Sequence, residues 1–419
     1  MFGRSQMPAR NLNDMNGLMS NFLHHVIGLA AATCLAAAST EAQRADTVRT
    51  ETLAQGVTHA RLVRNAGPWV IHVVKVDLRR ADVQVRPVRA HDQLTTRERV
   101  SAMAGRRIAA GERVLTAVNA DFFDLASGAS ENNVVLDGEW WKGVRVTESP
   151  YDTYDNVHAQ FAMTGAGRPL LDRFTFDGWA WLPRASFPLL SLNAPTTGTY
   201  EGTTIWTPRY GAATPRDTVR KPSELTLAPA GRRADTLLYI RRSNAKGGGT
   251  AIPSNGVVLS AFGARAAAVD STADGDTVRI LLAAAPWPAS SRAAGPALII
   301  GGWPRILRGG ASVAARAPSD EGTIARNAEM RHPRTGVGFS RDSATLFLVT
   351  VDGRQSASAG MTLVEFAALM KELGAWNALN FDGGGSTTLV IGDKVVNVPS
   401  DQTGERAVGS ALFIVQKRK

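Results

Sequence analysis

The chain has 419 residues, 44% of them apolar, which is enough for a substantial hydrophobic core and excludes a disordered or fibrous protein. The formal net charge is +10. This charge favours anionic substrates or surfaces, although a coding preference for arginine explains it more simply. The basic residues form no Lys/Arg block, so a nucleic-acid groove is not expected.

The first 43 residues are typical of a secretory signal. Arg4 and Arg10 precede an apolar stretch, residues 26–38, that is too short to span a bilayer and is followed by small residues. We expect cleavage near Gln43 and an exported protein that is periplasmic, cell-surface or extracellular, with no stable membrane insertion afterwards. The only cysteine, Cys34, is lost with this segment, so disulfides and thiol chemistry are excluded.

Residues 44–111 predict an N-terminal β-rich part that packs on the domain following it. Three apolar or alternating stretches predict strands of an antiparallel sheet: residues 57–63, 69–76 and 83–88. A short helix is expected within residues 92–110, with Thr95 or Thr96 as its N-cap. Its inward-facing residues are expected to be Val100, Met103 and Ile108.

Residues 114–124 predict a strand that ends in a group of polar side chains. The stretch VLTAVNADFFD brings Asn119, Asp121 and Asp124 to a strand end, where functional sites are commonly built. A hairpin with an Asp-Gly turn is expected at residues 134–141. Its Trp140 and Trp141 suit either stacking on a sugar or ordinary packing.

The region between about residues 150 and 300 predicts further short strands and long loops, because Gly and Pro interrupt its apolar stretches every ten or so residues. An amphipathic helix follows at residues 361–373. Thr362 and Glu365 form a capping-box pattern at its start, and Gly374 ends it.

The most informative stretch is WNALNFDGGGSTTLVI, residues 376–391. It predicts a strand, a tight turn and a second strand, with Asp382 at the turn. Three consecutive glycines suit a steeply curved turn or the close approach of a ligand to backbone N–H groups. A hairpin loop capped by its own aspartate is the alternative.

Seven motifs of this chain resemble the phosphodiester glycosidase family. They are NADFFD (119–124), RHPRTGVGFSRD (331–342), VDGRQ (351–355), SAGMTL (358–363), NFDGGGSTTLV (380–390), VNVPSD (396–401) and ERAVGSAL (405–412). The resemblance covers residues 112–416, and Asp121 departs from it because the family more often has glycine there. It implies an α+β domain of mixed, largely antiparallel sheets with a few packed helices. It also implies an exported hydrolase that cleaves the C1–O bond of a sugar-1-phosphodiester.

This chemistry needs a carboxylate near the anomeric carbon and donors around the phosphate. Asp382 is the first choice for the carboxylate, with Asp352 or Asp121 as the second. His332 suits a proton shuttle or a surface role. The residues expected to bind the substrate are Asn119, Arg334, Thr335, Gly383, Gly384, Gly385, Ser386, Thr387 and Arg406.

No cofactor or catalytic metal is expected, because the chain has no HExxH motif, no His/Cys cluster and no calcium-loop spacing. A structural Ca²⁺ on the aspartates remains an alternative. Two other functions remain open: a metal-dependent phosphodiesterase that cleaves P–O, and a non-catalytic protein that binds envelope polysaccharide through Trp140, Trp141 and the basic surface. The expected partner is a carbohydrate phosphodiester, such as an exopolysaccharide, while the sugar and the oligomeric state are not indicated.

Overall fold

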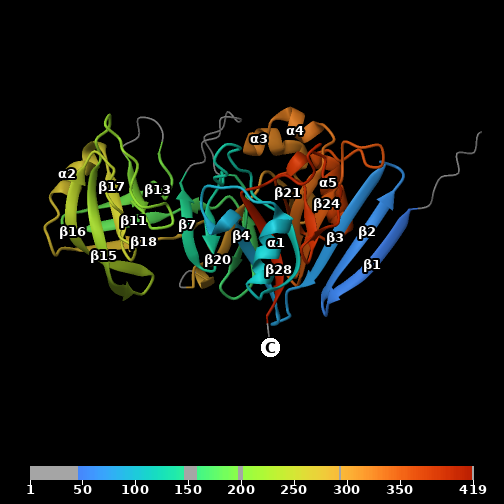
Figure 1. The fold of residues 1–419 in the computed structure, drawn as a ribbon, viewed down its shortest axis with the longest axis horizontal. Helices are drawn as coiled ribbons and strands as arrows, with labels where there is room; N and C mark the ends of the chain where they lie inside the picture. The colour runs from blue at the N-terminus through green and yellow to red at the C-terminus, as the bar shows by residue number, and fades with distance from the viewer. Residues whose placement is uncertain (1–45, 146–157, 197–201, 292–293, 418–419) are drawn as a thin grey trace, which may run out of the picture. The chain divides into compact units, whose positions relative to one another are not determined.

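The computed structural model describes residues 46–145, 158–196, 202–291 and 294–417, so the predicted signal segment lies outside the described residues (Figure 1). Strands dominate and pair antiparallel, except for one parallel pair of short strands, β13 and β14. The α-helices of the described chain have only 5 to 10 residues. The prediction of largely antiparallel sheets is therefore confirmed, whereas the α+β label fits only loosely.

Two of the sheets meet at the glycine-rich turn that follows Asp382. The eight-stranded sheet has the spatial order β1 (Thr47–Ala54), β2 (Val57–Arg64), β3 (Trp69–Asp77), β24 (Thr345–Val351), β23 (Arg334–Phe339), β25 (Asn377–Asn380), β21 (Arg305–Arg308) and β22 (Ala311–Ser312). The five-stranded sheet has the order β27 (Lys394–Val395), β26 (Leu389–Ile391), β5 (Arg113–Asn119), β28 (Ser410–Gln416) and β4 (Val83–Arg89).

The remaining strands form a thirteen-stranded sheet and a small two-stranded one. The larger has the order β12 (Ala185–Leu189), β11 (Gly178–Leu182), β18 (Thr277–Leu281), β16 (Thr236–Lys246), β15 (Ser223–Arg233), β17 (Val257–Ala261), β14 (Thr203–Trp206), β13 (Ser191–Leu192), β7 (Glu139–Val144), β6 (Val134–Leu136), β20 (Pro296–Gly301), β8 (Gln160–Thr164) and β9 (Pro169–Asp172). The smaller pairs β10 (Thr175–Phe176) with β19 (Ala284–Ala285).

Helices cover the outer faces of the eight- and five-stranded sheets. The α-helices are α1 (Val100–Ala109), α2 (Ala266–Asp270), α3 (Ala317–Glu321), α4 (Ala325–Glu329) and α5 (Leu363–Glu372). The 3₁₀ helices are η1 (Ala90–Asp92), η2 (Gly263–Arg265), η3 (Ala289–Ser291), η4 (Ala314–Arg316) and η5 (Gly384–Ser386). Figure 1 shows α3, α4 and α5 grouped near β21 and β24. α1 packs on β5 of the five-stranded sheet, whereas α2 packs on β15 of the thirteen-stranded sheet.

Alternation along the strands explains this layering. In β24, Leu346 and Leu348 enter the core between the two sheets, whereas Phe347 and Val349 face the core that contains α5. Successive strand residues point to opposite faces, so a strand covered on both sides is apolar throughout. In β28, Leu412 enters the core between the two sheets, whereas its neighbours Ala411 and Phe413 lie in the cluster that contains α1 residues. The two sheets therefore face each other, with a helical layer outside each.

The first helix differs from its prediction. It begins at Val100 with Arg99 as its N-cap residue and without a side-chain cap, so neither Thr95 nor Thr96 caps it. Val100 and Met103 are buried as expected, but Ile108 is 39% exposed. The preceding residues are held by an isolated bridge between Glu98 and Val408 instead, which delays the helix start. The second predicted helix is confirmed, with its Thr362–Glu365 capping box.

Candidate active site

The glycine-rich turn joins two different sheets. The predicted strand, tight turn and strand are confirmed as β25, η5 and β26. β25 pairs with β23 and β21, whereas β26 pairs with β5 and β27, so the alternative of a hairpin is wrong. The two strands belong to different sheets and therefore do not pair with each other. The Asp382 N–H donates to the Ala120 carbonyl at 2.9 Å, just past the end of β5. Asp382 thus lies at the seam between the sheets.

The three glycines are needed because other parts of the chain approach the turn closely. Gly384 has φ +58°, and a Cβ there would lie 3.0 Å from Nη2 of Arg354. A Cβ on Gly385 would lie 2.1 Å from Nη2 of Arg406. Neither glycine could carry a side chain without displacing an arginine. The turn therefore allows two guanidinium groups to come near Asp382.

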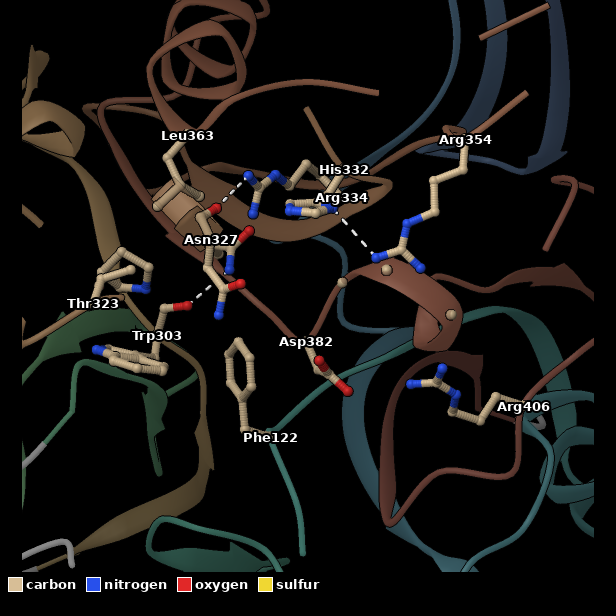
Figure 2. A pocket seen from close by; sticks show the side chains of 15 residues that line it. Phe122, Trp303, Thr323, Asn327, His332, Arg334, Arg354, Leu363, Asp382 and Arg406 are labelled. Carbon is tan, nitrogen blue, oxygen red and sulfur yellow. Dashed lines mark hydrogen bonds between the residues drawn. The ribbon is translucent and has the colours of Figure 1, made fainter. Parts of the chain in front are cut away.

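A cavity of about 200 Å³ opens above this turn (Figure 2). Figure 2 shows Asp382 between Phe122 and Arg406, Arg354 near the glycine turn, and Arg334 beside Asn327. The cavity is lined by Phe122, Trp303, Pro304, Thr323, Asn327, His332, Arg334, Arg354, Leu363, Asn380, Asp382, Gly383, Gly384, Gly385 and Arg406.

The charged side chains of this lining are three arginines and one aspartate. Arg334 donates from Nε to the Met361 carbonyl at 2.7 Å and from Nη2 to the carbonyl of Asn327, also at 2.7 Å. Burial lowers its pKa to about 10, and the charge of Arg354 adds to this. Its Nη1 has no hydrogen-bond partner in the described chain. The lining is therefore suited to an anion.

The other two arginines are held differently. Arg406 forms a bidentate pair with Asp401, at 2.7 and 3.0 Å, and not with its sequence neighbour Glu405, which accepts from Ser101. Arg354 is exposed, has φ +60°, and its Nη2 lies 3.3 Å from Nδ1 of His332. Burial and the nearby arginines lower the pKa of His332, which favours its neutral form. Of the three, Arg354 is the most free to move onto a ligand.

Asp382 has the properties of a reactive carboxyl. Burial raises its pKa to about 6, against the opposing effects of the Ser386 hydrogen bond and the charge of Arg406. It is the only carboxyl among the described residues that line the cavity. A carboxyl with this pKa is largely ionised at neutral pH yet still basic enough to accept a proton.

The two second-choice carboxyls lie outside the cavity lining. Asp352 is 2% exposed and accepts hydrogen bonds from the side chain of Asn397 and the N–H of Val398. Asp121 is also 2% exposed and accepts from Asn132. Burial raises the pKa of each to about 6. Neither is placed to touch a ligand in the cavity.

Four of the expected substrate-binding residues also lie beneath the cavity instead of lining it. Asn119 is fully buried: its Oδ1 accepts from Thr335 Oγ1 at 2.8 Å and from Thr388 N at 3.0 Å, and its Nδ2 donates to the Asp382 carbonyl. Such contacts position the turn. The buried residues of this group are Asn119, Thr335, Ser386 and Thr387.

The three glycine N–H groups differ in availability. Gly384 N donates to the Pro333 carbonyl at 2.9 Å, and Gly383 N interacts with the Asp382 carboxyl. The N–H of Gly385 has no hydrogen-bond partner among the described residues. The turn thus offers one free backbone donor beside the arginines, fewer than a run of three glycines suggests.

One side of the cavity is formed by aromatic and amide side chains that the sequence motifs did not indicate: Phe122, Trp303 and Asn380. Phe122 meets Trp303 edge-on with ring centroids 5.6 Å apart, and Asn380 follows on β25. Phe122 lies inside the NADFFD motif and Arg354 inside VDGRQ, so both stood next to aspartates that drew more attention. Trp303 comes from a distant Gly-Gly-Trp-Pro segment with no chemical signature.

The tryptophan pair proposed for sugar stacking is not available for it. Trp140 and Trp141 are 7% and 6% exposed; Trp140 packs on Phe176, and Trp141 lies under the guanidinium of Arg209. The predicted hairpin that carries them is confirmed, with Asp137 and Gly138 at positive φ. Their burial removes the aromatic part of the polysaccharide-binding alternative, which also invoked the basic surface.

Within the described ranges, no three His, Cys, Asp or Glu side chains gather closely enough to ligate a metal ion. In the same part of the chain, no helix has the length and apolar character that crossing a bilayer requires.

Comparison with known proteins agrees with the motifs. Residues 236–415 match the phosphodiester glycosidase family model. An uncharacterised prophage protein of Bacillus subtilis, YomE, is 40% identical over 85 residues, which are 20% of this chain and 13% of that protein. The mouse N-acetylglucosamine-1-phosphodiester alpha-N-acetylglucosaminidase is 34% identical over 82 residues, 20% of this chain and 16% of the enzyme. The matched stretches are thus small parts of both relatives.

The fold is shared with a solved exported protein of Burkholderia pseudomallei, which is 19% identical with a TM-score of 0.66 over 88% of this chain and 96% of that one. Residues 236–415, which contain the turn, Asp382 and all three cavity arginines, are therefore the part of the chain that is similar to the phosphodiester glycosidase family.

Proposed function

We propose that the protein hydrolyses the glycosidic C1–O bond of a sugar-1-phosphodiester. The observation that carries this proposal is the position of Asp382: a carboxyl with a pKa near 6 faces a cavity whose other charged groups are guanidiniums. The family match supports the reaction class. The substrate, the export and the roles of individual residues are part of the proposal.

The phosphate of the substrate binds at the arginine side of the cavity. A phosphodiester carries one negative charge, and the departing phosphate monoester gains a second as the bond breaks. Arg354, the free Nη1 of Arg334 and the N–H of Gly385 meet that growing charge, so they stabilise the transition state more than the bound substrate. Guanidinium groups suit phosphate because their planar donors match its oxygens.

Asp382 acts on the sugar side of the scissile bond. In its ionised form it either removes a proton from the attacking water or attacks C1 directly, while positive charge builds on the ring. A phosphate monoester is a good leaving group, so no second carboxyl is needed as a general acid. This agrees with a cavity lined, in the described chain, by one carboxyl. The proposal includes no metal, because the arginines supply the positive charge.

The site of action lies outside the cytoplasm. The N-terminal sequence has the pattern of a secretory signal, and the solved relative from Burkholderia pseudomallei is described as exported. The substrate is accordingly a glycan or envelope polysaccharide that carries sugar-1-phosphodiester linkages.

The position of bond cleavage tests the proposal. Purified residues 44–419 are screened against sugar-1-phosphodiesters in water enriched in heavy oxygen, with a chelator present, and the products are analysed by mass. Label in the sugar hydroxyl is the expected result. Label in the phosphate, or activity that the chelator abolishes, would instead identify a metal-dependent phosphodiesterase.

A further inference from the structure

One buried oxygen in the cavity has no partner. Asn380 on β25 is 3% exposed and lines the cavity, and its Oδ1 has no hydrogen bond in the described chain. An unsatisfied buried acceptor is costly, so native structures keep few of them away from functional sites. This oxygen is therefore a feature that a ligand is expected to satisfy.

The orientation of the amide is fixed by the backbone next to it. Asn380 Nδ2 donates to the Trp303 carbonyl at 2.7 Å, and the Trp303 N–H donates to the Asn380 carbonyl at 2.8 Å. If the amide flipped, Oδ1 would face the Trp303 carbonyl oxygen and the two acceptors would repel. The group that Asn380 presents to the cavity is therefore an acceptor, and only a donor can pair with it.

This acceptor makes the two sides of the cavity chemically different. The arginines and the free N–H of Gly385 attract phosphate oxygens, whereas the Asn380 oxygen repels them and suits a neutral group that carries a hydrogen. Thr323, 5% exposed and in the same lining, adds a hydroxyl oxygen without a partner in the described chain. Phe122 and Trp303 provide apolar surface near it.

We infer that Asn380 is a specificity residue that accepts a hydrogen bond from a hydroxyl or amide N–H of the substrate sugar. The inference rests on the proposed function and deepens it, because it orients the substrate with its sugar at the Asn380 and Trp303 side and its phosphate at the arginines. It excludes substrates whose group at this position lacks a donor. Thr323 supports the same ring through its own hydroxyl.

Binding of uncleavable analogues tests this inference. The probes are C1-phosphonates of glucose, galactose and mannose, each with its set of monodeoxy analogues, and affinities are measured by calorimetry. For the sugar that binds, removal of one hydroxyl should weaken binding about 10- to 100-fold, since the deoxy analogue leaves the buried acceptor unpaired. In Asn380→Ala this ratio should fall to about twofold or less.

A matched pair of hydroxyl deletions provides the control. Thr323→Val and Thr350→Val each remove a buried hydroxyl without a partner, but only Thr323 lines the cavity. Thr323→Val should reduce the discrimination against a monodeoxy analogue, and Thr350→Val should not change it. These variants and the wild-type series keep the test independent of how well Asn380→Ala folds.

Two results would overturn the inference: every monodeoxy analogue binds within about twofold of its parent, or the loss persists unchanged in Asn380→Ala. Either can occur in a protein that hydrolyses sugar-1-phosphodiesters normally, and in that case the proposed function stands. Failure to bind any phosphonate, together with failure to hydrolyse any diester, counts against the proposed function itself.

Discussion

The cavity at the glycine turn and the loop that follows β24 each contain a buried aspartate whose pKa is raised to about 6. In the loop, Asp352 is enclosed by Asn397 and Val398, and Asn397 also bonds the Thr387 carbonyl beneath the turn. In the cavity, Asp382 faces open space and guanidinium groups. The same pKa therefore arises from burial in both regions, and only one of them gives a ligand access to the carboxyl.

This difference shows that a raised pKa does not by itself mark a reactive group. Asp352 accepts hydrogen bonds from Asn397 and Val398, and these contacts hold the chain next to the turn, so we assign Asp352 a positioning role. Asp382 has the access that chemistry requires. Four experiments separate the two regions.

Replacement of Asp382 should have the largest effect. Asp382→Asn removes the basic oxygen while keeping the size of the side chain, so kcat/KM for a sugar-1-phosphodiester should fall about 10³-fold or more. Asp352→Asn should reduce it about tenfold at most, through the position of the turn. Similar losses in the two variants would contradict the assignment.

Replacement of Arg354, the cavity arginine with the fewest hydrogen bonds, should have the second-largest effect. Arg354→Ala should lower kcat/KM about 100-fold, raising KM and lowering kcat together, since its contact with phosphate strengthens as the leaving group gains charge. The matched control is Arg331→Ala, an exposed arginine that pairs with Glu365 outside the cavity lining. Its kcat/KM should stay within about twofold of wild type. Equal behaviour of the two variants would remove Arg354 from the site.

The pH profile should follow Asp382. Its carboxylate is the active form, and burial raises its pKa to about 6, so kcat/KM should be level above that pH and fall about tenfold per pH unit below it. Asp352→Asn should keep this profile even though it removes a carboxyl of similar pKa. A shift of the acid limb of the pH profile in Asp352→Asn would mean that Asp352, and not Asp382, controls the profile.

The smallest effect concerns stability. The folded protein holds the Asp352 proton up to about pH 6, whereas the unfolded chain releases it near the ordinary pKa of about 4, so this group makes folding less favourable as pH rises through that window. Asp352→Asn lacks this loss. Between pH 4.5 and 7, the free energy of unfolding of Asp352→Asn should therefore rise relative to wild type by on the order of 2 kcal/mol. Its Tm should rise relative to wild type by a few degrees. A constant Tm difference would contradict the buried titration.

Local patterns predicted much of the β structure. The strands at residues 57–63, 69–76 and 83–88 and the hairpin of Trp140 were confirmed, because alternation and turn residues act over a few positions. The three strands do not share one sheet as predicted, since the third, β4, pairs with β28 in the five-stranded sheet. The predicted N-cap of α1 was wrong, and so was the alternative of a hairpin between β25 and β26. Both depend on pairing with residues far along the chain, such as Glu98 with Val408, and local propensity contains no information on that pairing.

The sequence by itself determined that the turn, Asp382 and Arg334 lie in motifs that resemble one family. Motifs of this kind can be recognised because they are defined by residue types and spacing. The tertiary structure decided which of these groups share a cavity, since Asp382, Arg354, Trp303 and Asn380 come from separate segments that meet where two sheets join. It also buried Asp121, Asp352 and Asn119 outside the cavity lining. Access to a ligand is a property of packing, and packing is settled only when distant strands pair.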